Sequence, residues 1–251
     1  MSSAKVIGHD LYFVSTVSNQ GVLYALDLTN NKVRKVSSLT DWKPSDGWLQ
    51  NVSMIDNELY VNLHSGDLTM GSETLYRVLN GALKEVTGAK SLIGPVKSGD
   101  FLYLADFNIM GKTVDNLSRV NLKTGENKAI GQDDFVYAIN RKHDGGGTSY
   151  SANDAIYVKG GFVYVLGYKD SDPKDEGSVY KVNPSDQTQV KLTSAAGPFW
   201  MVDNQIYYVD GATGYLAKTD VNGAERIQTA KLTDEGLVYT LTYKEGVYSV
   251  K

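Results

Sequence analysis

Asp203-Asn204-Gln205-Ile206-Tyr207-Tyr208-Val209-Asp210 is the stretch that decides the fold, because its turn signal and apolar–tyrosine–apolar triplet recur along the chain. Two short apolar runs joined by a turn of Gly, Asn or Asp form a β-hairpin, and most triplets have such a run before their turn. A hairpin that recurs in this way indicates a repeat protein built from strands. The six triplets, with small variations, are Leu11-Tyr12-Phe13, Leu59-Tyr60-Val61, Leu102-Tyr103-Leu104, Val163-Tyr164-Val165, Ile206-Tyr207-Tyr208 and Val247-Tyr248-Ser249.

A second strand pattern follows each of the first five triplets, as in Leu23-Tyr24-Ala25-Leu26-Asp27 and Val179-Tyr180-Lys181-Val182-Asn183. A turn and a fourth short strand then complete the unit. The triplet tyrosines are 48, 43, 61, 43 and 41 residues apart. Four antiparallel strands in each unit of this length are typical of β-propeller blades. The sequence therefore predicts an all-β fold, a single β-propeller domain over residues 1–251.

The number of blades depends on how the last unit is counted. Five units have four strands each, whereas the sixth, from about residue 237, has only two before residue 251. We expect six four-stranded repeats with the last one incomplete. Five blades with an added hairpin are the alternative, since a ring removes its exposed edges only when its last blade is completed.

Composition excludes several classes of function. A net charge of −4 argues against a nucleic-acid partner, which needs a basic surface. The absence of Cys excludes disulfides and thiolate sites. No apolar run is long enough to span a membrane.

The first residues lack the apolar core of a signal peptide. We expect an extracellular or cell-surface protein whose signal peptide is absent from this sequence, and a cytoplasmic protein is the alternative. We also expect a monomer.

The stretch 203–210, with Leu216-Ala217-Lys218-Thr219-Asp220-Val221-Asn222-Gly223 after it, resembles the blades of low-density-lipoprotein-receptor (YWTD)-like propellers. It is most similar to their bacterial relatives, extracellular repeat domains of unassigned function in Gram-positive surface proteins. The units with Asn57-Glu58-Leu59-Tyr60 and Asp100-Phe101-Leu102-Tyr103 keep the first element but lose the Asp before the later Gly. The resemblance implies an extracellular interaction module and transfers no catalytic residue.

The long segment 131–154 explains the tyrosine spacing of 61 and is a candidate site, because long loops in compact domains are often functional. It is either a ligand-covering flap whose glycines, Gly145-Gly146-Gly147, permit positive φ, or a surface excursion with an extra strand over 135–139. Propeller ligands usually sit on the face that carries the loops between blades. The candidate ligand-binding residues on or beside these loops are Asp106, Arg141, His143, Tyr150 and Tyr168.

Trp42 and Trp48 lie in one loop between the first two blades, where they could stack on sugar rings or anchor a peptide. The alternative is that they fill the wedge between these blades. Asp170, Asp172 and Asp175 are weak calcium candidates, because Pro173 and Lys174 break the spacing of an EF-hand loop, and a solvated acidic turn is the favoured interpretation. We expect no cofactor.

His64 and His143 could each act as a general base beside Asp67 or Asp144, but no motif marks a nucleophile. The sequence therefore favours a non-enzymatic binding module of an exported bacterial protein, which recognises a glycan or a protein through its loop face. A propeller lyase or hydrolase with an axial His/Asp site is one alternative. A purely structural scaffold is the other.

Overall fold

The computed structural model confirms an all-β protein, with strands and no helix in the part of the chain that it describes. None of the described segments could therefore cross a membrane as an apolar helix.

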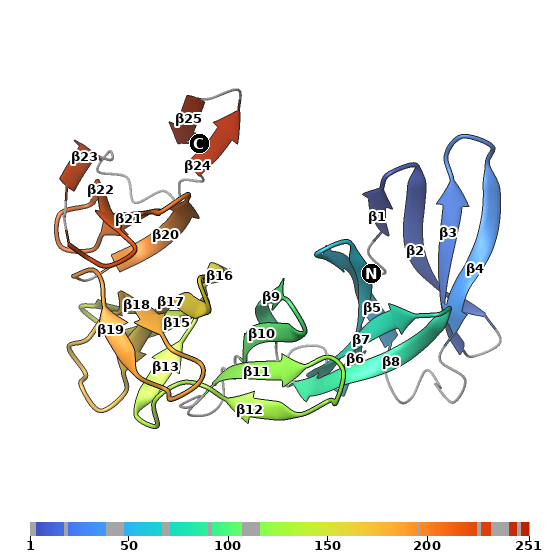
Figure 1. Cartoon of the computed structure of the whole chain (residues 1–251), viewed down its shortest axis with the longest axis horizontal. Helices are drawn as coiled ribbons and strands as arrows, with labels where there is room; N and C mark the ends of the chain where they lie inside the picture. The colour runs from blue at the N-terminus through green and yellow to red at the C-terminus, as the bar shows by residue number, and fades with distance from the viewer. Residues whose placement is uncertain are drawn as a thin grey trace. The chain divides into compact units, whose positions relative to one another are not determined.

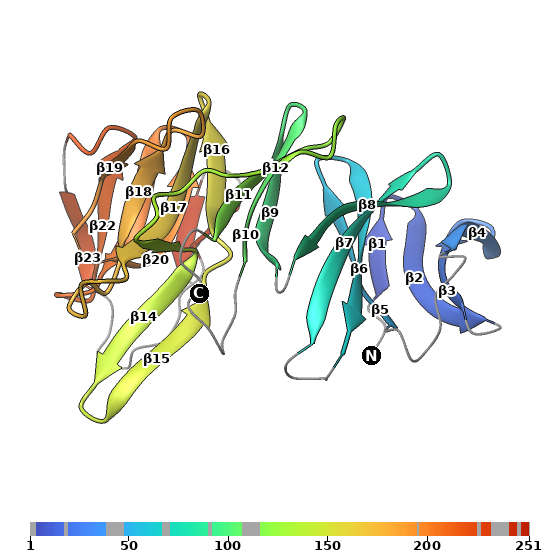
Figure 2. The ribbon, with the colours of Figure 1, turned by 90° about the horizontal axis from the view of Figure 1, so that it is seen from below.

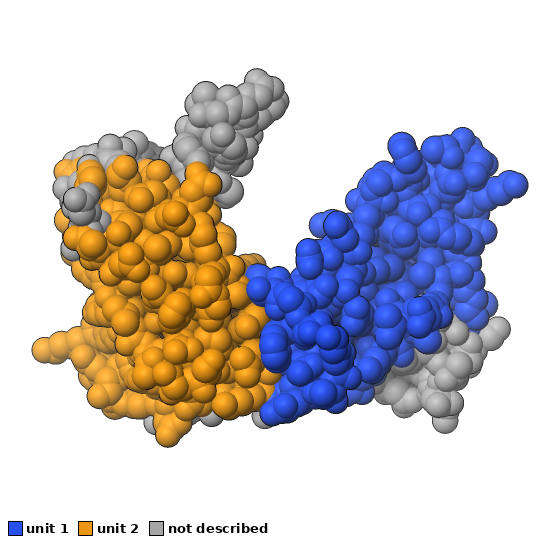
Figure 3. Space-filling model, in the orientation of Figure 1, with its two compact units in different colours: residues 1–92, 96–102, 120–127 blue, residues 93–95, 103–119, 128–251 orange. Residues whose placement is uncertain are grey.

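The chain divides into two compact units (Figure 3). Unit 1 comprises residues 1–92, 96–102 and 120–127, and unit 2 comprises residues 93–95, 103–119 and 128–251. The single domain over 1–251 stays a prediction. The described residues are 4–17, 20–38, 48–66, 71–89, 92–106, 116–194, 196–224, 227–231, 241–244 and 247–250.

Unit 1 contains two four-stranded antiparallel sheets whose strands pair in chain order (Figure 1). The first comprises β1 (Ala4–Ile7), β2 (Asp10–Val17), β3 (Gln20–Asp27) and β4 (Lys32–Ser38). The second comprises β5 (Trp48–Ile55), β6 (Glu58–Ser65), β7 (Ser72–Leu79) and β8 (Ala82–Ala89). A third sheet has residues in both units and comprises β9 (Leu92–Ser98), β10 (Phe101–Asp106), β11 (Leu117–Asn121) and β12 (Asn127–Ala129).

Unit 2 contains a fourth and a fifth sheet. The fourth comprises β16 (Ile156–Lys159), β17 (Phe162–Lys169), β18 (Ser178–Val182) and β19 (Gln189–Lys191), with β13 (Phe135–Tyr137) as an extra strand. The fifth comprises β20 (Ala196–Val202), β21 (Gln205–Asp210), β22 (Tyr215–Asp220) and β23 (Ile227–Lys231). Two further hairpins are β14 (Ile139–Asp144) with β15 (Gly147–Ala152), and β24 (Leu241–Lys244) with β25 (Val247–Val250). Five four-stranded repeats and a two-stranded sixth, predicted from the triplets, are thus confirmed in the described residues.

Apolar packing between neighbouring sheets forms the core of each unit. In unit 1, Leu23 of the first sheet and Val61 of the second belong to one buried cluster. In unit 2, Leu166 of the fourth sheet packs with Phe199 and Tyr208 of the fifth. The triplet strands are therefore covered by their neighbours, as expected for blades that shield one another.

Three of the turns between third and fourth strands, those after β3, β11 and β22, share one local arrangement that explains their recurring Asp or Asn. The Asp27 carboxylate accepts the amide of Thr29, and Asn121 Oδ1 accepts the amides of Lys123 and Thr124. Asp220 plays the same part in its own turn. Such side chains substitute for backbone acceptors and close tight turns. These contacts are local in sequence, and this is why the turns were predictable.

Tyr137 of β13 joins distant parts of unit 2 through its backbone and its ring. Its amide donates to Asn116 Oδ1 (2.7 Å), and its carbonyl accepts from Asn116 Nδ2 (2.7 Å). Its hydroxyl donates to Gln189 Oε1 (2.6 Å). The fully buried ring lies against Gly131 and Gly167, where a side chain would collide with it. The extra strand is therefore held by these hydrogen bonds and by the close packing of its tyrosine ring against the two glycines.

Replacing Gly131 by Ala tests this packing. A Cβ at residue 131 would lie 2.3 Å from Tyr137 Cε2, so the ring or the backbone must shift. We expect Gly131→Ala to lower the free energy of unfolding by about 1–3 kcal/mol, as overpacked cores do. Gly146→Ala, whose Cβ meets no atom within 4 Å, is the matched control. Equal stabilities in urea unfolding would contradict the packing role of Gly131.

Candidate functional site

The hairpin β14–β15 projects from the sheets of unit 2 (Figure 2). It occupies the segment 131–154, which the sequence predicted to hold either a flap or an extra strand. The extra strand is confirmed as β13, which pairs with Gly167–Lys169 of β17 in antiparallel fashion. The flap interpretation used the freedom of Gly145, Gly146 and Gly147 to adopt positive φ, but none of them lies in the left-handed region. Regular antiparallel pairing over Ile139–Asp144 takes the place of a glycine-hinged flap.

The ladder of the hairpin leaves one edge of β15 open. The amide of Asn153 donates to the carbonyl of Ala138 (2.8 Å), so these two opposed residues form a hydrogen-bonded pair of the ladder. Because such pairs alternate in an antiparallel ladder, the amides of Thr148, Tyr150 and Ala152 point away from β14. No other described strand pairs with β15. Its six residues are all exposed and include neither a charge nor a proline.

Arg141 fixes the base of the hairpin to the turn 170–177, called here the acidic turn. Its side chain is buried, and Nε donates to the carbonyl of Asp175 (2.9 Å). Nη2 donates to the carbonyl of Lys169 (3.2 Å) and contacts those of Asp172 and Asp175. The guanidinium carbon lies 4.1 Å from the centre of the Tyr168 ring. The structure thus gives Arg141, predicted as a ligand-binding residue, contacts that anchor the hairpin.

Tyr168 and Tyr150 lie close to Arg141 but differ in exposure. Tyr168, on β17, is 3% exposed, and burial raises the pKa of its hydroxyl to about 12. Tyr150, on β15 directly opposite Arg141, is 49% exposed. Three of the predicted site residues therefore meet in space, and only Tyr150 among them presents much of its side chain to solvent.

Carboxylates of the acidic turn bind its own backbone. Asp172 Oδ1 accepts the amide of Lys174 (2.9 Å), and Asp175 accepts the amides of Lys169 (2.8 Å) and Gly177 (3.0 Å). Asp170 donates its amide to the carbonyl of Asp134. Among the described side chains, no three of His, Asp or Glu are arranged to hold a metal ion. The weak calcium candidates Asp170, Asp172 and Asp175 thus lie in a turn stabilised by its own amides.

The acidic turn is further held to the neighbouring loop by Asp134, which accepts the hydroxyl of Ser171 (2.6 Å) and forms an ion pair with Lys169 (3.6 Å). The hydrogen bond from the Ser171 hydroxyl keeps the pKa of Asp134 below its ordinary value. A polar surface hollow beside the turn is lined in part by Lys174, Ser178 and Lys191.

The two candidate histidines lie in different environments. His143, on β14, is exposed, and its Nδ1 is 2.9 Å from Thr148 Oγ1 on the paired strand. His64 lies within β6, and its side chain is 6% exposed. Residue Asp67 lies outside the described residues, as does the side chain of Asp144. The expected pairing of a histidine with either carboxylate is therefore not described.

The remaining predicted site residues lie elsewhere. Asp106 ends β10, and its amide donates to the carbonyl of Asn116 (3.0 Å). Trp42 lies outside the described residues, and for Trp48 only the backbone, at the start of β5, is described.

The open edge of β15 was not predicted from the sequence. The run Gly147-Thr148-Ser149-Tyr150-Ser151-Ala152, neutral and free of proline, was the available signal.

No family model matches the chain, and no curated protein matches it. Solved structures do resemble it. An oligogalacturonate lyase in complex with manganese superimposes with a TM-score of 0.57 at 12% identity, covering 95% of this chain and 65% of that chain. An oligogalacturonate lyase from Vibrio parahaemolyticus gives 0.56 at 11% identity, with the same coverage of 95% and 65%.

A puromycin-hydrolyzing peptidase from Mycobacterium tuberculosis gives a TM-score of 0.53 at 11% identity, covering 90% of this chain and 38% of that chain. This chain thus spans less than two thirds of the length of each of these structures. At such identities the likeness concerns the fold alone. Together with the four-stranded sheets it establishes a β-propeller fold.

Removing the Arg141 guanidinium tests its anchoring role. Arg141→Met removes a buried guanidinium and leaves the carbonyls of Lys169, Asp172 and Asp175 without this donor, so we expect a loss of about 2–4 kcal/mol in the free energy of unfolding. Amide exchange in the acidic turn should accelerate at the same time. Lys142→Met, at the exposed neighbouring position, is the control. Unchanged exchange in 170–177 would show that Arg141 does not hold this turn.

Alkaline pH should weaken the fold through Tyr168. Because its folded pKa of about 12 lies above the value of about 10 in the unfolded chain, the neutral phenol stabilises the fold fully below about pH 10 and less as pH rises towards 12. Tyr168→Phe should therefore lose less stability than the wild type between about pH 10 and 12 in urea unfolding. Identical pH dependence in Tyr168→Phe and the wild type would refute this assignment.

Proposed function

We propose that this chain is a non-enzymatic binding module that recognises a protein partner by pairing an extended peptide segment with the open edge of β15. The observation that carries the proposal is the set of outward amides at Thr148, Tyr150 and Ala152 on an exposed strand. Sheet edges of this kind accept an additional strand, with main-chain hydrogen bonds giving affinity and alternate side chains giving specificity.

The composition of β15 supports the same conclusion. Exposed edge strands are usually protected from pairing by charges, prolines or bulges. β15 has no charge and no proline, and its ladder with β14 is regular. Its Thr, Ser and Tyr side chains are those that recognition surfaces use for adaptable hydrogen bonds and aromatic contact. The edge is thus suited to contact with another polypeptide.

The rigidity of the hairpin base is a further argument. Binding costs less when the binding element is already ordered. Arg141 ties β14 to three carbonyls, and Asn153 Nδ2 donates to Asn140 Oδ1 (3.1 Å) at the same end. β15 is therefore presented on a fixed base, although it lies outside the apolar cores of the sheets.

We place this module in an exported or cell-surface bacterial protein, in line with the resemblance of residues 203–223 to extracellular propeller repeats. A glycan ligand was the other possibility at the loop face, and it rested on Trp42 and Trp48, whose side chains are not described. The open edge of β15 favours a polypeptide instead, because a sugar would leave its row of outward backbone groups largely unused.

Proline at residue 148 provides the decisive test. Random peptides displayed on phage are selected against the wild-type protein and then measured against Thr148→Pro, which removes an outward amide but no ladder hydrogen bond. We expect binding to weaken by at least about tenfold. Thr148→Val, which keeps the amide, should bind like the wild type. Peptides that bind Thr148→Pro equally well, or a selection without binders, would contradict strand addition.

Two further measurements separate this proposal from its competitors. Bound peptide should slow the hydrogen exchange of the Thr148 and Tyr150 amides, while the Ser149 amide, already bonded to β14, changes little. Incubation with oligogalacturonate and Mn²⁺ examines the lyase alternative. We expect no unsaturated product, and turnover would overturn a purely binding function.

A further inference from the structure

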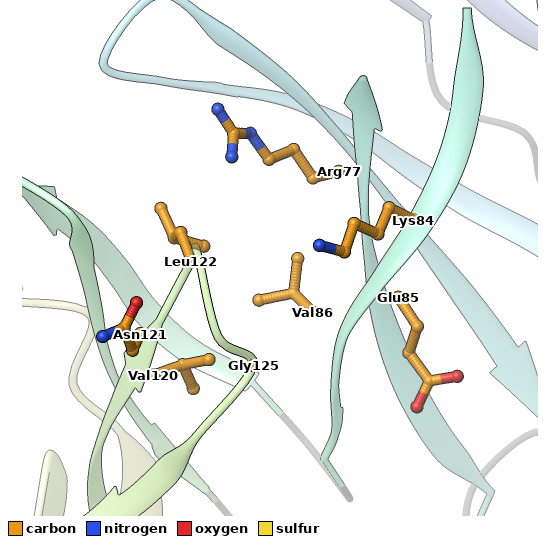
Figure 4. A pocket seen from close by; sticks show the side chains of 8 residues that line it. All are labelled: Arg77, Lys84, Glu85, Val86, Val120, Asn121, Leu122 and Gly125. Carbon is orange, nitrogen blue, oxygen red and sulfur yellow. The ribbon is translucent and has the colours of Figure 1, made fainter. Parts of the chain in front are cut away.

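The strand β15 differs from the outer strands of the five sheets in having no charged residue. Each of those sheets ends in an outer strand that contains lysine, namely Lys32 and Lys35 on β4, Lys84 on β8, Lys128 on β12, Lys191 on β19 and Lys231 on β23. On β8, Lys84 and Glu85 line a hollow with room for about one water (Figure 4). Charged side chains, lysine above all, keep an edge from pairing with a strand of another chain. β15 lacks this protection.

The residues of β15 are nearly symmetric about Tyr150. Two serines, Ser149 and Ser151, flank the tyrosine, and the small residues Thr148 and Ala152 follow on either side. The outward amides belong to Thr148, Tyr150 and Ala152, so this set is also centred on Tyr150. Two copies of the strand related by a two-fold axis at Tyr150 therefore offer each other matching donors and acceptors.

A two-fold axis perpendicular to the sheet at Tyr150 fixes the register between two copies of β15. It places Tyr150 opposite Tyr150 of the second copy, Ser149 opposite Ser151, and Thr148 opposite Ala152. Among two-fold registers, this one pairs all three outward residues of each copy with outward residues of the other. Tyr150 is 49% exposed, and an aromatic pair across neighbouring strands contributes about 0.2–1 kcal/mol.

The charges of β14 stay apart in this register. Lys142 lies opposite Ser149, so its row continues through Ser151 and Asn140 of the second copy. The row of His143 passes through Thr148 and ends at Ile139 of the second copy. The two copies of β14 are three strand spacings apart, about 14 Å, which exceeds the screening length of about 8–10 Å in physiological salt. No charge therefore opposes its own counterpart.

We propose that β15 pairs in antiparallel fashion with β15 of a second copy, which gives a two-fold dimer with the strand order β14–β15–β15–β14. This pairing uses the same open edge as the proposed function, on which it rests, and it names the partner that occupies the edge when no peptide is bound. Lys142 and His143 on β14 protect the outer edges of the joined sheet from further growth.

The dimer is expected to be weak. Pairing of two six-residue strands buries little surface, so we expect a dissociation constant on the order of 0.1–1 mM. The monomer predicted from the sequence is then the main form at low micromolar concentration, and the dimer forms where the chain is concentrated.

Cysteine cross-linking tests the pairing and its register together, because the chain contains no cysteine. Ser149 and Ser151 of the two copies form a non-hydrogen-bonded pair, whose Cα atoms lie about 4.5 Å apart, within the range that a disulfide spans. An equimolar mixture of Ser149→Cys and Ser151→Cys should form a disulfide-linked heterodimer under mild oxidation. Either variant alone places its two sulfurs on a diagonal of about 7–8 Å and should cross-link at least about tenfold more slowly.

The same pair of variants carries its own controls. Adding Thr148→Pro to both should slow the cross-link at least about tenfold, because it removes the amide that meets Ala152 of the second copy, whereas Thr148→Val should leave the rate unchanged. Cross-linking of either single variant as fast as the mixture, or no cross-link in the mixture at about 1 mM protein, would overturn the proposal.

Charge at residue 150 gives a readout without covalent chemistry. Tyr150→Lys and Tyr150→Glu each place two like charges directly opposite each other, so each variant alone should associate at least about fivefold more weakly than the wild type in sedimentation equilibrium. Their mixture should associate at least about fivefold more tightly than either variant alone. An absence of any gain on mixing would contradict the pairing of Tyr150 with its counterpart.

Competition separates this dimer from the proposed function. A peptide selected on the wild-type protein should suppress the cross-link between Ser149→Cys and Ser151→Cys, because both occupants need the same edge. Peptide binding that leaves the cross-link unchanged contradicts peptide addition to β15 and leaves the dimer intact. Peptide binding that is sensitive to Thr148→Pro, in a protein that never cross-links, contradicts the dimer alone.

Discussion

Two of the strands that carry the tyrosine triplets, β10 and β17, are buried on both faces, so their sheets depend on neighbours that cover them. In β17, six consecutive residues from Val163 are buried, where a half-exposed strand would show alternation. Leu166 packs with Phe199 in unit 2, and Leu23 with Val61 in unit 1. Because packing buries the faces of these strands, the groups that are accessible to a ligand lie at turns, at strand edges and at the ends of side chains.

Local patterns in the sequence were sufficient to predict the repeat. The features that they did not predict depend on contacts between residues far apart in the sequence. The triplets and the Asp or Asn turns predict hairpins because their hydrogen bonds join residues close in sequence. Arg141 was predicted to bind a ligand because it lies in a long polar segment, yet its partners are carbonyls about thirty residues away. No spacing rule identifies a carbonyl of another turn as a partner, so this contact required the tertiary structure.

Charged groups in the two units are stabilised in different ways. Arg141 is surrounded by neutral carbonyls and the Tyr168 ring, and this satisfies its donors without cancelling its charge. Glu58 is matched by two cations and a phenol. Asp210, fully buried, accepts the hydroxyls of Ser194 and Thr213. Charged groups with such sets of partners hold neighbouring segments together.

The projecting hairpin has a consequence for how such a chain can evolve. Lys142 and His143 of β14 and all six residues of β15 are exposed, and none of them belongs to the apolar clusters described for the sheets. Substitutions on exposed positions usually change stability by less than about 0.5 kcal/mol. The tip can therefore accumulate changes, or be exchanged for another hairpin in the laboratory, while the repeats beneath it are conserved. A chain of this design can vary one short exposed segment and leave its architecture untouched.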